Sequence, residues 1–429
     1  MAIADLIARF LGEPSAPATM EIEAPKPRAM PAPNLAPAPA PLSNLGPARR
    51  QRRRQERFSY TGAKTDRLNS DWRTNGSGAN TEIAAGLATL RNRSSDLARN
   101  NPYALKALES LTANIVSSGI RARWDNPRAQ ELWDAWTVDA DVGSDLDLYG
   151  LQMLAVRSWL ERGDTVIRRR WRRLDDPLAV PFQIEVMEGD FLDHQKTTAT
   201  AIGGRIVQGV EFDPIGRRSA YWLHKTHPGE TGITGSSVSA PIDAADIAHL
   251  YRATRAGQVR GIPWLAAVIQ ALRDLERYEA AERNRKRSQA GMVGVLIPRD
   301  ETFDPDSTDA VGLVENDSEG DPVDQIEPNS SYVARGGASY TFSSPASDQG
   351  YPQYMSTQLH GIAAGALTSY ENLTNDLREI NYSSFRAGDV EQQRVYKAVQ
   401  TQVVIPLFLR RVAQWFLDAA IVSGQLPAG

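Results

Sequence analysis

The sequence lacks cysteine entirely, over a length of 429 residues. This absence excludes disulfide bonds, thiolate metal sites and a cysteine nucleophile, and it is consistent with a reducing compartment. Long apolar runs are also missing, since no stretch approaches the roughly 18 residues that a membrane-spanning helix needs. The first residues, MAIADLIARFLGEPSAP, have no basic segment followed by a continuous apolar core, so they do not predict a secretory signal.

An excess of positive charge is missing as well. The chain carries 48 basic and 52 acidic side chains, for a formal net charge of −4. A protein that binds nucleic acid tightly over its whole surface is usually basic, so any such contact in this chain must be local or weak. The hydrophobic share of 41% and the length are those of an ordinary globular protein with two or three domains.

The motifs of common enzyme classes are absent: there is no G-x-S-x-G, no Walker loop and no H-E-x-x-H. Residue types that bind divalent ions gather in two places, which contain Glu185, Glu188, Asp190, Asp193 and His194, and then His224 and His227. Such clusters can hold a metal for nuclease chemistry. Alternation along a strand, however, would divide the first set between two faces, and only Glu230 stands near the two histidines. We therefore expect no metal, no cofactor and no catalytic residue.

The first 58 residues are predicted to form a disordered arm. Residues 13 to 48 are rich in proline and alanine and cannot bury enough apolar surface to offset chain entropy. The block RRQRRRQER at 49–57 is typical of an arm that contacts phosphate or an acidic protein face, and a solvated charge run is an equal alternative. The folded body is expected to begin near Tyr60.

Hydrophobic periodicity predicts helices first and strands second. Apolar spacing of three and four residues predicts helices over 80–118, 128–139 and 147–162. Trp133 and Trp136 are expected in the core or at an interface. The pattern then changes to period two in DTVIRRRWRR, PFQIEVME, GRIVQGVEFD and SAYWLHKT, with turn signals between them. Together these segments predict a small antiparallel sheet attached to helices, an α+β fold.

Residues 256–290 are predicted to form a helix about 40 Å long. Pro263 stands near its start, where a missing N–H costs little. The first half has an apolar stripe and the second half is polar nearly all round, so we expect the helix to leave a packed body; an ordinary core helix is the alternative. Its basic side chains are Arg273, Arg277, Arg283, Arg285, Lys286 and Arg287.

An acidic, turn-rich stretch follows, and then three further elements. They are a helix from about Tyr351 to Leu367, a polar loop, and a long helix over 389–423 that Pro406 is expected to bend. About twenty residues is long for a plain connector between helices, which favours a functional role for the loop.

Several segments in this order resemble the lambda-type portal proteins of tailed bacteriophages. They are ARNNPYALKALESLTANIVSSG, ERGDTVIRRR, VQGVEFDPIGRRSAYWL, IAHLYRATRAGQVRGIP with the charged helix after it, and LTNDLREINYSSFRAG. The resemblance covers roughly residues 60–425. Relatives continue past a final G-x-L, matched here by Gly424, Gln425 and Leu426, whereas this chain stops at Gly429. We therefore expect a C-terminal crown that is short or missing.

The resemblance implies a portal fold that assembles into a ring oligomer. Its parts would be an arm (1–58), an α+β wing (59–255), a first stem helix (256–290), a β-containing clip (291–345), a second stem helix (346–367), a tunnel loop (368–388) and a long kinked wing or crown helix (389–429). It implies a homo-oligomer, typically of twelve subunits, at one capsid vertex of the virion, assembled in the cytoplasm of a bacterial host.

The function implied is that of a non-enzymatic channel for genome packaging and ejection. Double-stranded DNA of any sequence would pass through the axis. The protein partners would be the terminase large subunit, a head-completion or adaptor protein and the major capsid protein, with no membrane. The alternative is a metal-dependent DNA-processing enzyme or a minor capsid structural protein.

The resemblance also places candidate residues. The tunnel loop would bring to the DNA Asn375, Arg378, Asn381, Tyr382, Ser383, Ser384 and Arg386. Neutral donors with few cations, offset by nearby acids, suit a surface that must touch phosphates and release them. The clip would offer a basic protein partner an acidic surface that contains Asp300, Glu301, Asp304, Glu315, Asp317 and Glu319.

Overall fold

The structure is a computed structural model that describes residues 70–71, 74, 76–201, 203–230, 238–291, 350–378 and 382–427. Residues from Ala79 onward belong to one structural unit. The predicted arm up to residue 58, and the predicted clip apart from Gly291, lie outside the described residues. Within those residues, no helix is both long and apolar enough to cross a membrane.

Helices open the described chain where periodicity predicts them. They are α3 (Ala79–Asn100), α4 (Pro102–Val116), α5 (Pro127–Val138) and α6 (Leu148–Arg162). Asn101 and Asn126 each accept hydrogen bonds from two backbone N–H groups of the following helix, and a proline occupies the first turn of both helices. A polar cap before such a proline satisfies donors that the first turn leaves free. The helical predictions for 80–118, 128–139 and 147–162 are therefore confirmed.

The strands form two small antiparallel sheets rather than one. The first has the order β2–β1–β8 and the second the order β3–β4–β5–β6–β7. Their strands are β1 (Asp164–Trp171), β2 (Phe182–Glu188), β3 (Thr198–Ala199), β4 (Arg205–Val207), β5 (Val210–Phe212), β6 (Arg218–Leu223), β7 (Ala240–Asp243) and β8 (Ile247–Tyr251). Strand β8 is fully buried and pairs with β1. It therefore belongs to the first sheet, although it follows β7 of the second sheet in the chain. The α+β class is confirmed.

The main core lies between the helices and the first sheet. Trp136 stacks on Phe182 with ring centroids 4.6 Å apart, and its Nε1 donates a hydrogen bond to the Phe182 carbonyl oxygen. Trp133 packs edge-on against Phe416 of the C-terminal helix. Both tryptophans are buried, which confirms their expected place in the core.

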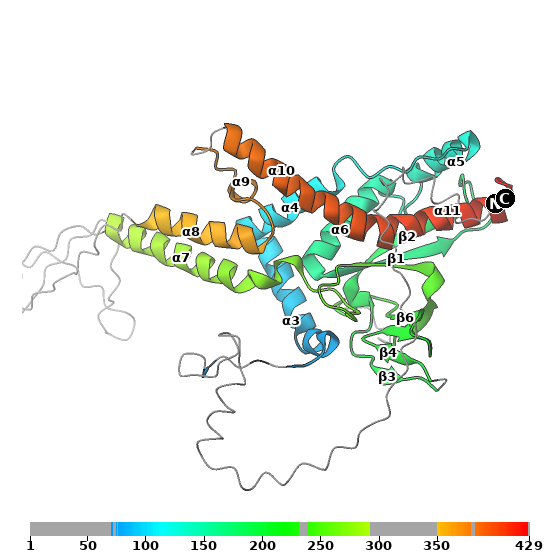
Figure 1. Cartoon of the computed structure of the whole chain (residues 1–429), viewed down its shortest axis with the longest axis horizontal. Coiled ribbons are helices and arrows are strands. Elements are labelled where there is room, and N and C mark those ends of the chain that lie inside the picture. The colour runs from blue at the N-terminus through cyan, green and yellow to red at the C-terminus, as the bar shows by residue number, and fades with distance from the viewer. Residues whose placement is uncertain are drawn as a thin grey trace, which may run out of the picture. The chain divides into compact units, whose positions relative to one another are not determined.

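The C-terminal helix is continuous and contains a wide turn at its proline. It consists of α10 (Tyr382–Val399), the π-helical segment η6 (Gln400–Leu409) and α11 (Arg410–Val422). Pro406 lies inside η6, where its missing N–H removes one hydrogen bond of the helix. Trp415 Nε1 donates to the Ala245 carbonyl oxygen at 2.7 Å and so fixes α11 on the body (Figure 1). The prediction of a long helix is confirmed, but the helix begins at residue 382 and not at 389, and at Pro406 it continues through π-helical turns without interruption.

A buried ionic cluster joins α3, both sheets and the chain before the next long helix. Asp164 at the start of β1 is fully buried between Arg91 and Arg260. Arg260 Nε donates to Asp164 at 2.6 Å, and its Nη2 donates to the Gly189 carbonyl oxygen at 2.6 Å. Burial raises the pKa of the Asp164 carboxyl, but the charges of Arg260 and Arg91 outweigh this and hold the pKa well below its usual value.

The motifs that carry the family resemblance converge on this cluster. Gly163 and Asp164 come from ERGDT, while Arg260 and Gly261 come from GQVRGIP. A Cβ on Gly261 would lie 1.7 Å from the Gly163 carbonyl oxygen, so both segments need the close approach that only glycine permits. These segments are therefore structural, and they bind the body together.

This arrangement corrects the start of the predicted long helix. Residues 256–263 form a loop, because Arg260 must reach the buried carboxylate and Gly261 must lie against another backbone. A short 3-10 turn, η5 (Trp264–Ala267), follows, and α7 (Ile269–Gly291) begins only afterwards. At 23 residues, α7 is about 35 Å long rather than about 40 Å. The elements after the clip are α8 (Tyr351–Gly365) and the short α9 (Tyr370–Thr374).

His249 is expected to make the fold sensitive to mild acid. Burial lowers the pKa of the His249 imidazole to about 4, although its contact with Asp164 acts in the opposite direction. The unfolded chain binds this proton near pH 6.5, so stability is lost as the pH falls from about 6.5 towards 4. We expect the melting temperature to fall over this range. A His249→Gln variant should show a smaller fall, and an equal fall in both proteins would contradict this assignment.

Candidate nucleic-acid interface

Helices α7 and α8 lie side by side and are joined firmly at their base (Figure 1). Trp264 Nε1 donates a hydrogen bond to the Ala366 carbonyl oxygen at 2.7 Å. Gly365 packs directly on Val268, because a Cβ added to the glycine would lie 2.4 Å from Val268 Cγ1. The small residue therefore lets the end of α8 approach the start of α7.

Farther along α7 and α8, aromatic side chains hold the two helices together. The ring centroids of Tyr278 on α7 and Tyr354 on α8 are 4.5 Å apart, and Lys286 Nζ lies over the Tyr351 ring. Tyr103 of α4 donates a hydrogen bond to Glu279 of α7 at 3.1 Å. Burial and the neighbouring Glu279 carboxylate raise the pKa of the Tyr103 hydroxyl to about 12.

The basic residues predicted on the first long helix are largely neutralised by acids on the same helix. The ion pairs of α7 are Arg273–Glu276, Arg277–Asp274, Arg283–Glu279, Arg285–Glu282 and Lys286–Glu282. Arg287 has no ion pair with a described residue. Since all five pairs connect residues three or four positions apart, they stabilise the helix modestly. Four acids on α7 thus compensate most, but not all, of the charge of its six basic residues.

The chain after α8 differs from the single loop predicted over 368–388. Ser369 caps the short helix α9, and Asn375 ends it in a left-handed conformation with φ 56°. Tyr382, Ser383, Ser384 and Arg386 belong to α10, because the helix starts at Tyr382. Asn381 lies outside the described residues. Among the described residues of the connection between α9 and α10, residues 375–378 are non-helical.

Arg378 is turned towards an acid within this connection. Its Nη2 and Nε donate to the two carboxylate oxygens of Asp376 at 2.6 and 2.8 Å. Hydrogen bonding by Arg378 lowers the pKa of the Asp376 carboxyl to about 2. Both side chains lie on the surface, where a phosphate can compete for the guanidinium. Arg386, by contrast, is exposed and has no ion pair with a described residue.

Sequence reasoning missed two cations beside Arg386. Arg394 and Lys397 lie on the exposed side of α10, and they too have no ion pair with a described residue. They were not grouped with Arg386, because the helix was expected to start at 389, after that residue. Helical spacing from Arg386, at eight and eleven residues, would have placed all three on one side.

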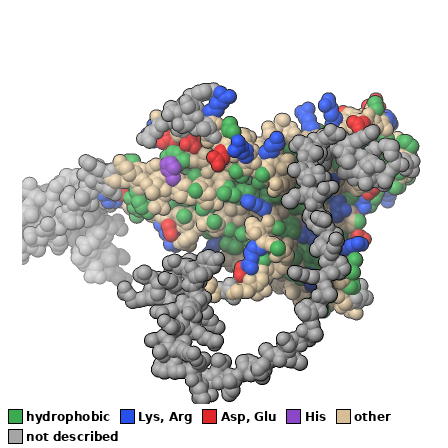
Figure 2. Space-filling model, viewed as in Figure 1, with side chains coloured by type: hydrophobic (Ala, Val, Ile, Leu, Met, Phe, Trp, Pro, Cys, Tyr) green, Lys and Arg blue, Asp and Glu red, His purple; other side chains and the backbone are tan. Residues whose placement is uncertain are grey.

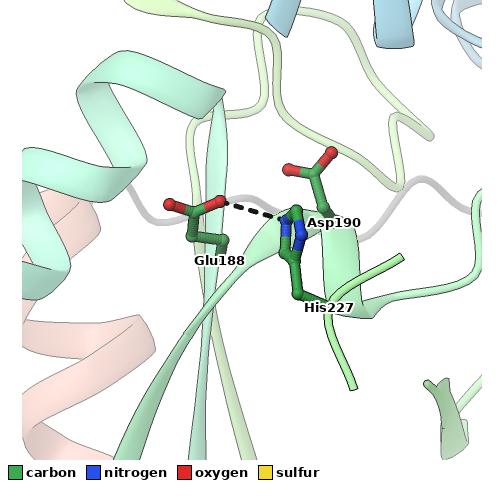
Figure 3. Close-up of side chains that lie close together, drawn as sticks. All are labelled: Glu188, Asp190 and His227. Atoms are coloured by element: carbon green, nitrogen blue, oxygen red, sulfur yellow. Dashed lines mark ion pairs between the residues drawn. The ribbon is translucent and has the colours of Figure 1, made fainter. Parts of the chain in front are cut away.

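One cluster of possible metal ligands lies elsewhere, at the edge of the body. Ligand atoms of Glu188, Asp190 and His227 lie within 4.8 Å of one another, and Figure 3 shows them converging from β2, from a 3-10 turn and from the segment after β6. Glu188 and Asp190 are two positions apart, a spacing that alternation places on one face. Glu185, which alternation places on the other face, is paired with Arg170 and does not belong to the cluster.

Arginines already neutralise the carboxylates of this cluster. Arg162 Nη2 lies 2.7 Å from Asp190 Oδ2, and its Nε lies 3.5 Å from Glu188 Oε2. His227 Nε2 is 3.4 Å from Glu188, and His224 lies 4.0 Å from Asp193. Each histidine of H-x-x-H therefore faces an acid that is distant in sequence. The arrangement is an ion-pair network, and a bound cation would have to displace Arg162 from it.

The acidic residues predicted on the clip lie outside the described residues. This applies to Asp300, Glu301, Asp304, Glu315, Asp317 and Glu319. Their assignment to a protein partner stays a prediction.

Comparisons with known proteins match this chain to one protein family. The model of the family described as "Phage portal protein, lambda family" matches residues 65–400. A curated relative, the "Probable portal protein" of Halomonas phage phiHAP-1, is 25% identical over 389 residues, which are 85% of this chain and 73% of the relative.

Solved structures that match this chain come from gene transfer agent particles. The virion of a native particle matches with a TM-score of 0.40 and 13% identity, over 81% of this chain and 82% of the other. The neck of a native particle computed with C12 symmetry matches with a TM-score of 0.41 and 14% identity, over 76% and 81%. Both TM-scores are below 0.5, so no conclusion about this chain rests on them.

Proposed function

Since the chain belongs to the lambda family of phage portal proteins, we propose that its copies form a ring around a channel for double-stranded DNA. The role of a portal protein in a virion is structural and not enzymatic. The observation that carries the proposal is the family match over 65–400, which includes α7, α8, the connection after α9 and α10, the first part of the long helix.

In this proposal the described elements take the parts of a portal subunit. The body with its two sheets is the wing, α7 and α8 are the stem helices, and residues 291–345 between them are the clip. The connection between α9 and α10, described over residues 375–378, is part of the tunnel loop, and the helix from Tyr382 is the long kinked helix. The firm base of the α7–α8 pair supports this assignment, because a projecting stem needs a rigid root.

The partners follow from the chemistry of each part. The acidic clip suits a basic face on the terminase large subunit during packaging, and on a head-completion or adaptor protein afterwards. The wing would contact the major capsid protein at one vertex. Assembly of a ring, typically of twelve subunits, would take place in the cytoplasm of the bacterial host, and the same channel would serve ejection.

DNA filling of particles tests the proposed function. In the virus or element that encodes this chain, we expect particles made without it to contain no packaged genome, and the full-length chain supplied in trans to restore filling. Shortening the connection around residues 379–381 should leave assembly intact and prevent filling or retention of DNA. Normally filled particles without the chain would rule out the role.

The N-terminal arm is expected to be dispensable for assembly. A stretch so rich in proline and alanine contributes little core, so its removal costs little stability. A variant that lacks residues 1–57 should form the same oligomer as the full chain, as measured by light scattering after gel filtration. Loss of the oligomer would show that the arm takes part in subunit contacts.

A further inference from the structure

The exposed side of α10 carries a ridge of positive charge. Its residues follow helical spacing of four, four, three and four: Arg386, Val390, Arg394, Lys397 and Thr401. All five are exposed, whereas Tyr396 and Val399 on the opposite side are buried in the core. Basic side chains are visible along the α10 region of the molecule in Figure 2.

The acids of α10 lie beside this ridge. Asp389 follows Arg386 by three positions and Glu391 precedes Arg394 by three, a spacing at which side chains of a helix are neighbours. Neither forms an ion pair with Arg386, Arg394 or Lys397 among the described residues. The cations of the ridge therefore stay outside ion pairs with described residues, in contrast to α7, where five of the six basic residues are paired.

We propose that Arg386, Arg394 and Lys397 bind the phosphate backbone of the DNA that passes through the channel. This inference rests on the proposed function and adds to it a contact surface on α10. The three cations span about 17 Å of helix, while duplex DNA carries one charge per about 1.7 Å of its axis. Such a ridge reads no sequence, because it offers charges to phosphates and no array of donors to base edges.

A contact with a second copy of the chain fits the ridge less well. The cores of permanent subunit interfaces are apolar and depleted of charge. Here three cations surround a single half-exposed valine, Val390. The ridge also begins directly after the connection assigned to the channel, which would bring Arg386 near the DNA.

The test compares two variants of the full-length chain with equal loss of charge. One changes Arg386, Arg394 and Lys397 to glutamine, and the control changes Arg273, Arg277 and Arg283 of α7 to glutamine. Glutamine is a good helix former, so both helices should persist. The probe is a random-sequence duplex of roughly 30 base pairs, and its binding to the assembled protein is measured by fluorescence anisotropy over a range of salt concentrations.

We expect the α10 variant to form wild-type oligomers and to bind at least about tenfold more weakly at low salt. Each lost phosphate contact should reduce the slope of log K against log salt by about 0.9, so the slope should fall by about 1–3 units. The α7 control should bind like the wild type. Arg386→Lys with Arg394→Lys should also keep the wild-type slope, since it conserves the charge.

Three results would overturn the inference. The first is equal affinity and slope in the α10 variant and the wild type. The second is a wild-type oligomer that binds no duplex at low salt. The third is loss of the oligomer in the α10 variant alone, which would identify the ridge as a contact with a second copy of the chain. A wild-type chain that forms no ring would instead contradict the proposed function, so the two failures are distinguishable.

Discussion

Replacing Arg260 by methionine is expected to lower the free energy of unfolding by about 3–5 kcal/mol, the cost of breaking a buried ion pair by removing one partner. Methionine fills a similar space but supplies no charge and no donor. Asp164 would keep only Arg91 as a close cation, and the Gly189 and Gln208 carbonyl oxygens would lose a buried donor. Urea unfolding followed by tryptophan fluorescence measures the change.

Arg255 provides the matched control for Arg260. It lies in the same loop and is ion-paired with Glu82, but both side chains are about half exposed. Surface ion pairs contribute about 0–1 kcal/mol, so Arg255→Met should change the free energy of unfolding by no more than that. Similar small losses in both variants would show that the Asp164 cluster does not hold the body together.

A single methyl group at Gly365 is expected to destabilise the chain by about 1–3 kcal/mol through overpacking. The added Cβ would lie 2.4 Å from Val268 Cγ1, and Val268 is buried where α7 and α8 meet. The loss of stability should arise from a weaker contact between α7 and α8. We therefore expect Gly365→Ala also to impair DNA packaging in particles, since the stem would lose its rigid root.

Two further variants make this prediction specific. Gly361 lies on the same helix with no neighbouring atom within 4 Å of an added Cβ, so Gly361→Ala should stabilise the chain by about 0.5–1 kcal/mol. Val268→Ala in the Gly365→Ala background should recover part of the loss, because it removes the colliding methyl. Equal effects at both glycines, or no recovery, would contradict the close contact.

Local patterns predicted the helices because their spacing is a property of the sequence itself. The helices predicted over 80–118 and 128–139 and the buried Trp133 and Trp136 follow from residues a few positions apart. The start of α7 was predicted too early, because the reason for the loop before it is a contact between Arg260 and Asp164, which are 96 residues apart.

At the candidate site, too, contacts between near neighbours in the sequence could be predicted, whereas contacts between distant residues could not. Neutralisation of the α7 cations could have been predicted, since Arg273 and Glu276 stand three residues apart. The pairing of His227 with Glu188 could not, because only the arrangement of the strands brings them together. The helical start at Tyr382 was missed because a serine, tyrosine and glycine composition resembles a loop, while tertiary packing decides the conformation.

The mass and shape of the full-length chain in solution test the central claim most directly. Light scattering and electron microscopy of the purified protein should show a closed ring, typically of twelve copies, with an axial opening wide enough for duplex DNA. A monomer that nicks DNA in the presence of magnesium would contradict the portal assignment and favour a metal-dependent enzyme.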